Sequence, residues 1–169
     1  RQDRMEEMQP FMGGGDMIRE VSREFVSYND SPHKFEAGTP SIVEAIGFGV
    51  ALEYLMKIGM ADIQKHESTL KGYAEKEFEN LHWLETQGNA PDKGAIFSFT
   101  MQGAAHAHDI STIVDRRGIA VRAGHHCAQP LMKHLGLNAT CRASFGMYNS
   151  TEEIDQLTSS LEFAYELLG

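Results

Sequence analysis

Short apolar runs that alternate with amphipathic helical stretches are the feature that most limits what this chain can fold into. The clearest run, Ala-Ile-Phe-Ser-Phe-Thr-Met at residues 95–101, follows a turn-forming segment rich in Asn, Pro, Asp and Gly, and it predicts a strand. Further strands are expected at residues 83–86, 118–121 and 140–145, and helices at residues 41–57, 60–81, 108–117, 130–135 and 151–168. A chain of 169 residues can bury one core of such elements and a second small lobe.

The first 38 residues show no long helical or strand periodicity. The segment 17–25 alternates weakly, as a short strand or hairpin does. Three consecutive glycines at residues 13–15 are not followed by a helix start or a Lys-Ser/Thr pair, so they predict a turn and not a phosphate-binding loop. Thr39 is expected to cap the helix at 41–57, with Pro40 as its first residue.

Charge and cysteine content argue against several classes of function. The chain carries 15 Lys and Arg against 24 Asp and Glu, a net charge of −9 without a basic cluster, which disfavours nucleic acid and anionic membranes as partners. Its apolar runs are far shorter than the roughly 20 residues of a membrane span. With two cysteines and no secretory signal, no disulfide is expected, and the chain is predicted to be cytoplasmic.

A strand-exit loop at residues 122–128 carries the most reactive group of the sequence, the thiol of Cys127, beside Arg122, His125 and His126. Cationic neighbours favour the thiolate, which is the nucleophile of covalent catalysis. Composition alone favours a different interpretation, in which Cys127 is a small buried hydrophobic residue, as most free cysteines are. A metal site is not predicted, because adjacent residues on an extended segment point to opposite sides and no Cys-x-x-Cys partner is present.

Arg142 lies in the middle of the strand expected at residues 140–145, among small residues. An unpaired guanidinium is costly in such a place. The pattern leaves two interpretations open: an internal salt bridge, or a binding site for an anionic ligand.

Four separated phrases of the chain are distinctive as a set. They are Arg-x-Gly-His-His-Cys-Ala at residues 122–128, Phe-Glu-Ala-Gly-Thr-Pro at 35–40, the segment 10–18, and Cys-Arg-Ala-Ser with the following Met-Tyr-Asn at 141–149. Taken in their order along the chain, they resemble the group II (SUF-type) cysteine desulfurases, fold-type I pyridoxal-phosphate enzymes of the class V aminotransferase family. The resemblance covers nearly the whole chain, and Cys127 takes the position of the family's persulfide-forming nucleophile.

The resemblance implies that the chain is the C-terminal part of such an enzyme, without the upstream half that carries the Schiff-base lysine. Lys34 directly precedes Phe-Glu-Ala-Gly-Thr and is interpreted as a surface charge and not as that lysine. Residues 1–40 would be an irregular segment of the absent large domain, 41–57 a linking helix, and 58–169 the small C-terminal domain. The implied fold is α+β: an antiparallel sheet of three or four strands with helices mostly on one face, plus the long linking helix.

The chemistry implied by the resemblance is removal of sulfur from L-cysteine with pyridoxal 5'-phosphate as cofactor, which gives L-alanine and a persulfide on Cys127. The sulfur would pass to an acceptor protein for iron–sulfur cluster assembly. Arg142 would bind the substrate carboxylate and Arg122 would help to orient the substrate. Thr39 would donate a hydrogen bond to the cofactor phosphate of the neighbouring subunit in a homodimer. The resemblance assigns no role to His125 or His126.

Two further functions are compatible with the same phrases. Selenocysteine lyases and related pyridoxal-phosphate lyases share the fold and much of the cysteine motif. The chain by itself, without the cofactor lysine, is expected to be inactive as an enzyme and would then serve as a dimerising or acceptor-binding module.

Overall fold

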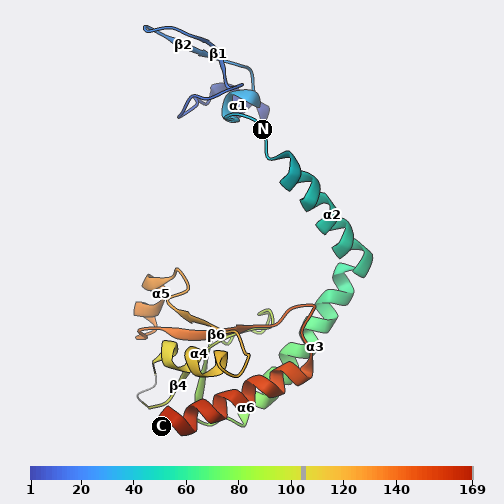
Figure 1. The fold of residues 1–169 in the computed structure, drawn as a ribbon, viewed down its shortest axis with the longest axis vertical. Coiled ribbons are helices and arrows are strands. Elements are labelled where there is room, and N and C mark those ends of the chain that lie inside the picture. Colours follow the sequence, from blue (N-terminus) through green and yellow to red (C-terminus); the bar gives the residue numbers. More distant parts are fainter. Residues whose placement is uncertain (104–105, 169) are drawn as a thin grey trace. The chain divides into compact units, whose positions relative to one another are not determined.

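The computed structural model describes residues 1–103 and 106–168 (Figure 1). The chain divides into two compact units, Arg1–Lys57 and Ile58–Gly169. None of the helices in the described part is long and apolar enough to cross a membrane.

The first unit is built from short elements that precede one long helix. They are α1 (Gln2–Glu7), the antiparallel strands β1 (Ile18–Val21) and β2 (Val26–Tyr28), the 3-10 helix η1 (His33–Phe35) and α2 (Ile42–Ile58). The paired strands β1 and β2 confirm the hairpin expected near residues 17–25.

The three glycines allow two backbone segments to approach closely. The N–H of Gly38 donates to the carbonyl oxygen of Gly15 at 2.8 Å. A Cβ added to Gly14 would lie 2.8 Å from the Cβ of Ala37, closer than real Cβ atoms come to other heavy atoms. Gly14 therefore packs against the Phe-Glu-Ala-Gly-Thr segment at a point where a side chain would not fit.

Helix α2 begins later than the capping pattern predicted. The first intrahelical hydrogen bond runs from the N–H of Ala45 to the carbonyl oxygen of Ser41, at 3.0 Å. The N–H of Ile42 instead closes a tight turn onto the carbonyl of Pro40 at 2.8 Å, which keeps Pro40 outside the helix. The prediction that Thr39 caps this helix was therefore wrong, and Ser41, whose residue type is an equally good cap, precedes the first helical residue.

Every residue of α2 between Ile42 and Val50 is exposed, and none in the helix is buried. Eight of its large apolar side chains are 43–78% exposed: Ile42, Val43, Ile46, Phe48, Val50, Leu52, Tyr54 and Met56. They lie around the whole circumference of the helix, a pattern typical of helices that are surrounded by other protein.

The second unit has an α+β fold, as predicted. Its elements are α3 (Met60–Glu79), β3 (Leu84–Gln87), β4 (Ile96–Met101), α4 (Ala107–Asp115), β5 (Arg122–Gly124), α5 (Gln129–His134), β6 (Thr140–Ser144) and α6 (Thr151–Leu168). The four strands form one antiparallel sheet in the order β3-β4-β6-β5. This confirms the expected antiparallel sheet of three or four strands.

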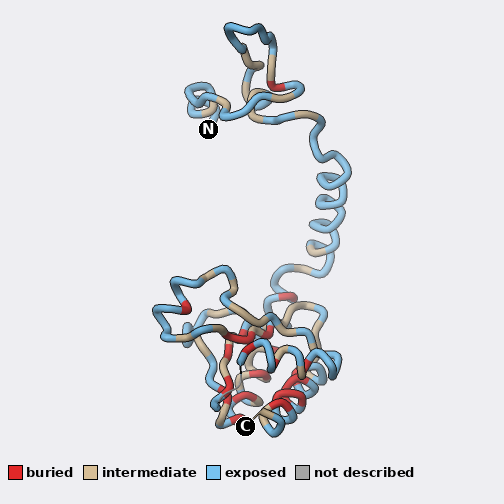
Figure 2. The backbone as a smooth tube through the Cα atoms, turned by 60° about the vertical axis from the view of Figure 1, so that its left-hand side comes forward, coloured by how far each residue is buried: buried red, intermediate tan, exposed pale blue. Residues whose placement is uncertain are grey.

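One face of this sheet is buried and the other is not. Alternate side chains of β4 and β6 enter the core, where they meet α3, α4 and α6: Phe97, Phe99, Met101, Cys141 and Ala143. The rings of Phe78 on α3 and Phe97 pack edge to face with their centroids 5.1 Å apart. Figure 2 shows the buried residues gathered inside this unit. The intervening side chains, Ser98 and Arg142 among them, point to the uncovered face.

A strand was predicted at residues 118–121, but the structure places the strand after them, at Arg122–Gly124. The N–H of Gly118 donates to the carbonyl of Asp115 at 2.9 Å, and that of Ile119 to the carbonyl of Val114 at 3.0 Å. These two bonds form a Schellman motif with Gly118 at a positive φ of 81°. Residues 118 and 119 are therefore used to end helix α4, and pairing with β6 begins only at Arg122.

Candidate active site

The loop with Cys127 is a tight turn between β5 and α5. The N–H of Ala128 donates to the carbonyl oxygen of His125 at 2.9 Å. The two central residues both have left-handed backbone angles, with φ 54° at His126 and φ 59° at Cys127. Turns with two such residues normally carry Asn and Gly at these positions. The protein therefore holds its thiol at the tip of a strained turn, and strain of this kind is concentrated at functional sites.

Cys127 is exposed, so its interpretation as a buried hydrophobic residue was wrong. A guanidinium N–H of Arg122 points at its sulfur, with Nη2 and Sγ 3.6 Å apart. This arrangement is complementary to negative charge on the sulfur. The turn borders a hollow of about 490 Å³ lined by Arg122, Ala123, His125, His126, Cys127, Gln129 and Pro130.

The second cysteine has the opposite environment. Cys141 is fully buried on β6, and its thiol donates to the carbonyl oxygen of Ala107 at 3.1 Å. Burial raises the pKa of Cys141 to about 12. It therefore remains a thiol at neutral pH and packs as a core side chain.

His126 points from the turn onto the beginning of β6. Its Nε2 lies 3.1 Å from the carbonyl oxygen and 2.8 Å from the Oγ1 of Thr140, a residue with no exposed surface. Burial lowers the pKa of His126 from its usual 6.5, and the charges of Arg142 and Arg122 lower it further, against the opposing effect of the hydrogen bond to Thr140. His126 is therefore neutral at physiological pH.

His125 points elsewhere and is exposed. Its Nδ1 lies 3.4 Å from the Nε2 of Gln129, the first residue of α5. Among residues 1–103 and 106–168, no group of three or more His, Cys, Asp or Glu side chains is arranged to hold a metal ion.

Arg142 and Arg122 lie directly opposite each other on β6 and β5, and Ser98 on β4 continues the same row across the sheet. The Nε of Arg142 is buried and has no hydrogen-bond partner within the described part of the chain. None of the ion pairs found between described residues includes either arginine. Two guanidinium groups on the uncovered face of a sheet, without a carboxylate, form a site suited to an anion.

The structure thus brings five of the six site residues predicted from sequence into one region of the second unit, while Thr39 belongs to the first. Thr39 is exposed in the bend that leads to α2, next to Gly38 with a φ of 78°. Lys34, the lysine that was rejected as the cofactor attachment point, donates from Nζ to the carbonyl oxygen of Glu6 at 3.2 Å.

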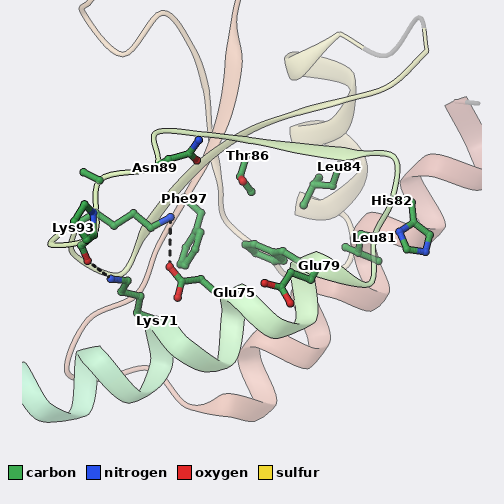
Figure 3. Close-up of a pocket in the computed structure, with 13 residues that line it drawn as sticks. Lys71, Glu75, Glu79, Leu81, His82, Leu84, Thr86, Asn89, Lys93 and Phe97 are labelled. Atoms are coloured by element: carbon green, nitrogen blue, oxygen red, sulfur yellow. Dashed lines mark hydrogen bonds and ion pairs between the residues drawn. The ribbon is translucent and has the colours of Figure 1, made fainter.

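A larger hollow, of about 540 Å³, lies between α3 and the segment that joins β3 to β4 (Figure 3). Its two lysines are already engaged by the protein. Lys93 lies 3.6 Å from a carboxylate oxygen of Glu75 and 4.5 Å from the centre of the Phe97 ring, and Lys71 donates to the carbonyl of Pro91 at 2.8 Å. It holds none of the residues predicted for the site, so the Cys127 turn remains the candidate active site.

Comparison with known proteins gives the family of the chain. Residues 1–157 match the family described as Aminotransferase class-V. The chain belongs to this family.

Similar class V proteins include a probable cysteine desulfurase of Xylella fastidiosa, 43% identical over 169 residues, and a cysteine desulfurase of Haloferax volcanii, 44% identical over 170 residues. In both cases the match covers 100% of this chain and 40% of the relative. The chain therefore spans about 40% of the length of the curated relatives it matches.

Solved structures agree with this match. The crystal structure of a cysteine desulfurase from Escherichia coli gives a TM-score of 0.89 with 34% identity, over 100% of this chain and 42% of that chain. The apo structure of a cysteine desulfurase from Thermococcus onnurineus gives 0.84 with 36% identity, over 99% of this chain and 41% of that chain.

Sequence reasoning missed one residue of the site in this class V chain. Thr140 was read only as the start of a strand, yet it anchors His126 through both its carbonyl and its hydroxyl. No local signal marks it, because the contact joins residues that are 14 positions apart. The left-handed turn was also missed: His is one of the few residue types enriched at a positive φ, but Cys is not, and no Gly or Asn marks the position of Cys127.

Proposed function

We propose that this chain is the C-terminal part of a group II cysteine desulfurase. The intact enzyme takes sulfur from L-cysteine with pyridoxal 5'-phosphate as cofactor, releases L-alanine and keeps the sulfur as a persulfide on Cys127. The names of the relatives and the full coverage of this chain by their matches support the proposal. Residues 1–40 then belong to the large domain, 41–57 form the linking helix, and 58–169 form the small domain.

One observation carries this proposal: an exposed thiol on a strained turn stands 3.6 Å from Arg122, which pairs in register with Arg142 on an uncovered sheet face. A desulfurase must place a thiolate near a substrate that also carries a carboxylate. The two arginines supply the carboxylate site, and the turn supplies the nucleophile. The buried Nε of Arg142, which has no partner among the described residues, supports its role as the principal carboxylate ligand, with Arg122 shared between substrate and sulfur.

The sulfur transfer is a displacement at the substrate sulfur. Cys127 as thiolate forms the new S–S bond, the substrate C–S bond breaks, and its electron pair stays with the substrate carbon, which takes up a proton to become alanine. Pyridoxal phosphate, when bound, supplies the electron sink that makes such a carbon a tolerable leaving group. Arg122 faces the sulfur before the attack and stabilises its negative charge.

The residues of this chain fit one end of the cofactor, its phosphate. Thr39 presents an exposed hydroxyl just before α2, and the amides that follow Ile42 at the start of that 17-residue helix are donors of the kind that bind phosphate. We assign the phosphate contact to Thr39 across a homodimer, and the ring to residues of the remaining protein. The apolar side chains around α2 support its packing against further protein.

The exposure of Cys127 also suits the second half of the reaction, in which a persulfide at the tip of a turn is passed to a sulfur-acceptor protein for iron–sulfur cluster assembly in the cytoplasm. An acceptor thiol attacks the outer sulfur, and Cys127 leaves as thiolate.

The test uses the full-length gene product loaded with pyridoxal phosphate. Alanine should form from L-cysteine, and both the Cys127→Ala and the Arg142→Met variants should lose it while they still bind cofactor. Cys141→Ala is the matched control and should keep the activity. If Cys141→Ala lost the formation of alanine while Cys127→Ala kept it, the assignment of Cys127 as the nucleophile would be overturned. Faster turnover of selenocysteine than of cysteine would favour a selenocysteine lyase.

A further inference from the structure

The backbone of the Cys127 turn is disfavoured by its own residue types, so something must hold it. His126 and Cys127 have φ values of 54° and 59°, in a region that Gly adopts freely, that Asn, Asp and His adopt at a cost, and that Cys rarely adopts. Only one hydrogen bond within the turn, from Ala128 to His125, closes it. A contact from outside the turn is needed to keep such a conformation populated.

That contact is the imidazole of His126. Its Nε2 reaches both the carbonyl oxygen and the Oγ1 of Thr140, at 3.1 and 2.8 Å. Thr140 is fully buried at the start of β6 and is paired with Gly124 of β5. The ring therefore ties the tip of the turn to a fully buried residue at the start of β6.

The chemistry of the contact fixes the tautomer. A backbone carbonyl only accepts hydrogen bonds, and a threonine hydroxyl can accept as well, so a proton on Nε2 satisfies both contacts and leaves Nδ1 as the bare nitrogen. Nδ1 is buried and has no partner within the described residues, so a proton there would lack an acceptor. The charged and titratable groups that face His126 are Arg142 on β6, Arg122 on β5 and His125 in the turn. All three disfavour a second proton.

We propose that His126 is a positioning residue for Cys127: its neutral ring clamps the turn to Thr140 and thereby holds the thiol at the Arg122 guanidinium. The proposal gives His126 a task in the desulfurase reaction and to that extent rests on the proposed function. The clamp acts through the sulfur–guanidinium contact, so its effect on the thiol should depend on Arg122.

The test measures iodoacetamide labelling of the 169-residue chain near neutral pH, with both cysteines read by mass spectrometry. We expect His126→Asn, which tolerates the left-handed backbone but is too short to reach Thr140, to slow Cys127 labelling by at least about threefold. In an Arg122→Met background the same change should have no further effect. Nitrogen NMR of His126 should show the Nε2–H tautomer.

Cys141 is the internal folding control, because it stays unlabelled as long as the core is intact. If His126→Asn exposes Cys141 to labelling, the Thr140→Val variant provides the test, because it keeps His126 and removes only the hydroxyl partner. We expect it to slow the labelling of Cys127 while the chain remains folded. An unchanged Cys127 rate in the folded variant, an equal slowing without Arg122, or an Nδ1–H tautomer would each overturn the clamp. None of these readouts needs cofactor or cysteine, so they fail or succeed separately from the desulfurase activity.

Discussion

Replacing Arg142 by Met separates a ligand-binding arginine from a structural one. The two side chains are similar in length, but Met carries no charge and no donor. A buried polar group without a partner costs about 1–3 kcal/mol, and a like charge directly opposite on the next strand costs about 0.2–1 kcal/mol. Both conditions hold at Arg142, which faces Arg122 and has a buried Nε without a partner within the described residues.

The side chain is only half-buried, so the lower part of these ranges applies. We expect Arg142→Met to raise the free energy of unfolding by about 1 kcal/mol. An internal ion pair would instead make the same change cost about 3–5 kcal/mol. Arg122→Met is the matched control on the facing strand; its side chain is exposed, and we expect a change within about 0.5 kcal/mol.

Urea denaturation followed by tryptophan fluorescence measures this change. The chain has one tryptophan, Trp83, which stacks on Tyr165 with ring centroids 4.4 Å apart, so the signal reports on the second unit alone. A loss of several kcal/mol in Arg142→Met, with an unchanged slope against urea, would refute the reasoning and make Arg142 a structural ion pair.

Three further predictions concern the Cys127 turn. Iodoacetamide should label Cys127 much faster than Cys141, because the latter is buried and its pKa is raised to about 12; equal rates would contradict this difference. Cys127→Gly should be more stable than Cys127→Ala by about 0.5–1 kcal/mol in urea denaturation, since strain at a φ of 59° outweighs the usual entropic advantage of Ala; the reverse order would show an unstrained turn. Because the pKa of His126 is lowered in the folded chain, the unfolded chain binds a proton at this imidazole at a higher pH than the folded chain does. The contribution of the neutral ring to stability is therefore present above pH 6.5 and is lost as the pH falls through the lower folded pKa. The loss should be smaller in His126→Asn, and a pH dependence identical to that of the parent would contradict it.

The sequence predicted well those elements whose signal is local and periodic. Residues 95–101 alternate because Phe97 and Phe99 enter the core while Ser98 does not, and this pattern is visible without a structure. The helix expected at residues 130–135 is followed by Gly136, whose φ of 70° ends α5, and Leu137 donates back to Met132 at 2.9 Å. Such signals depend on neighbours along the chain, so the residue pattern contains them.

Features that depend on distant segments were not predictable. The apolar run at 118–121 has strand composition, yet its first two residues end helix α4. Strand β5 begins only at Arg122, where the backbone comes within pairing distance of β6. The row of Ser98, Arg142 and Arg122 follows from strand register across three strands, which the sequence does not state. Cys127 and Arg142 were predicted as site residues from the motif. The pairing of Arg142 with Arg122 and the contact of His126 with Thr140 became visible only in the structure.

The central claim is that Cys127 receives the sulfur of L-cysteine. Peptide mass spectrometry of the full-length, cofactor-loaded protein after one turnover with L-cysteine, without reductant, tests it most directly. We expect a mass increase of one sulfur atom on the peptide that carries Cys127, together with one equivalent of alanine and an unmodified Cys141. Formation of alanine with the extra sulfur on Cys141, or with no sulfur retained at Cys127, would contradict it.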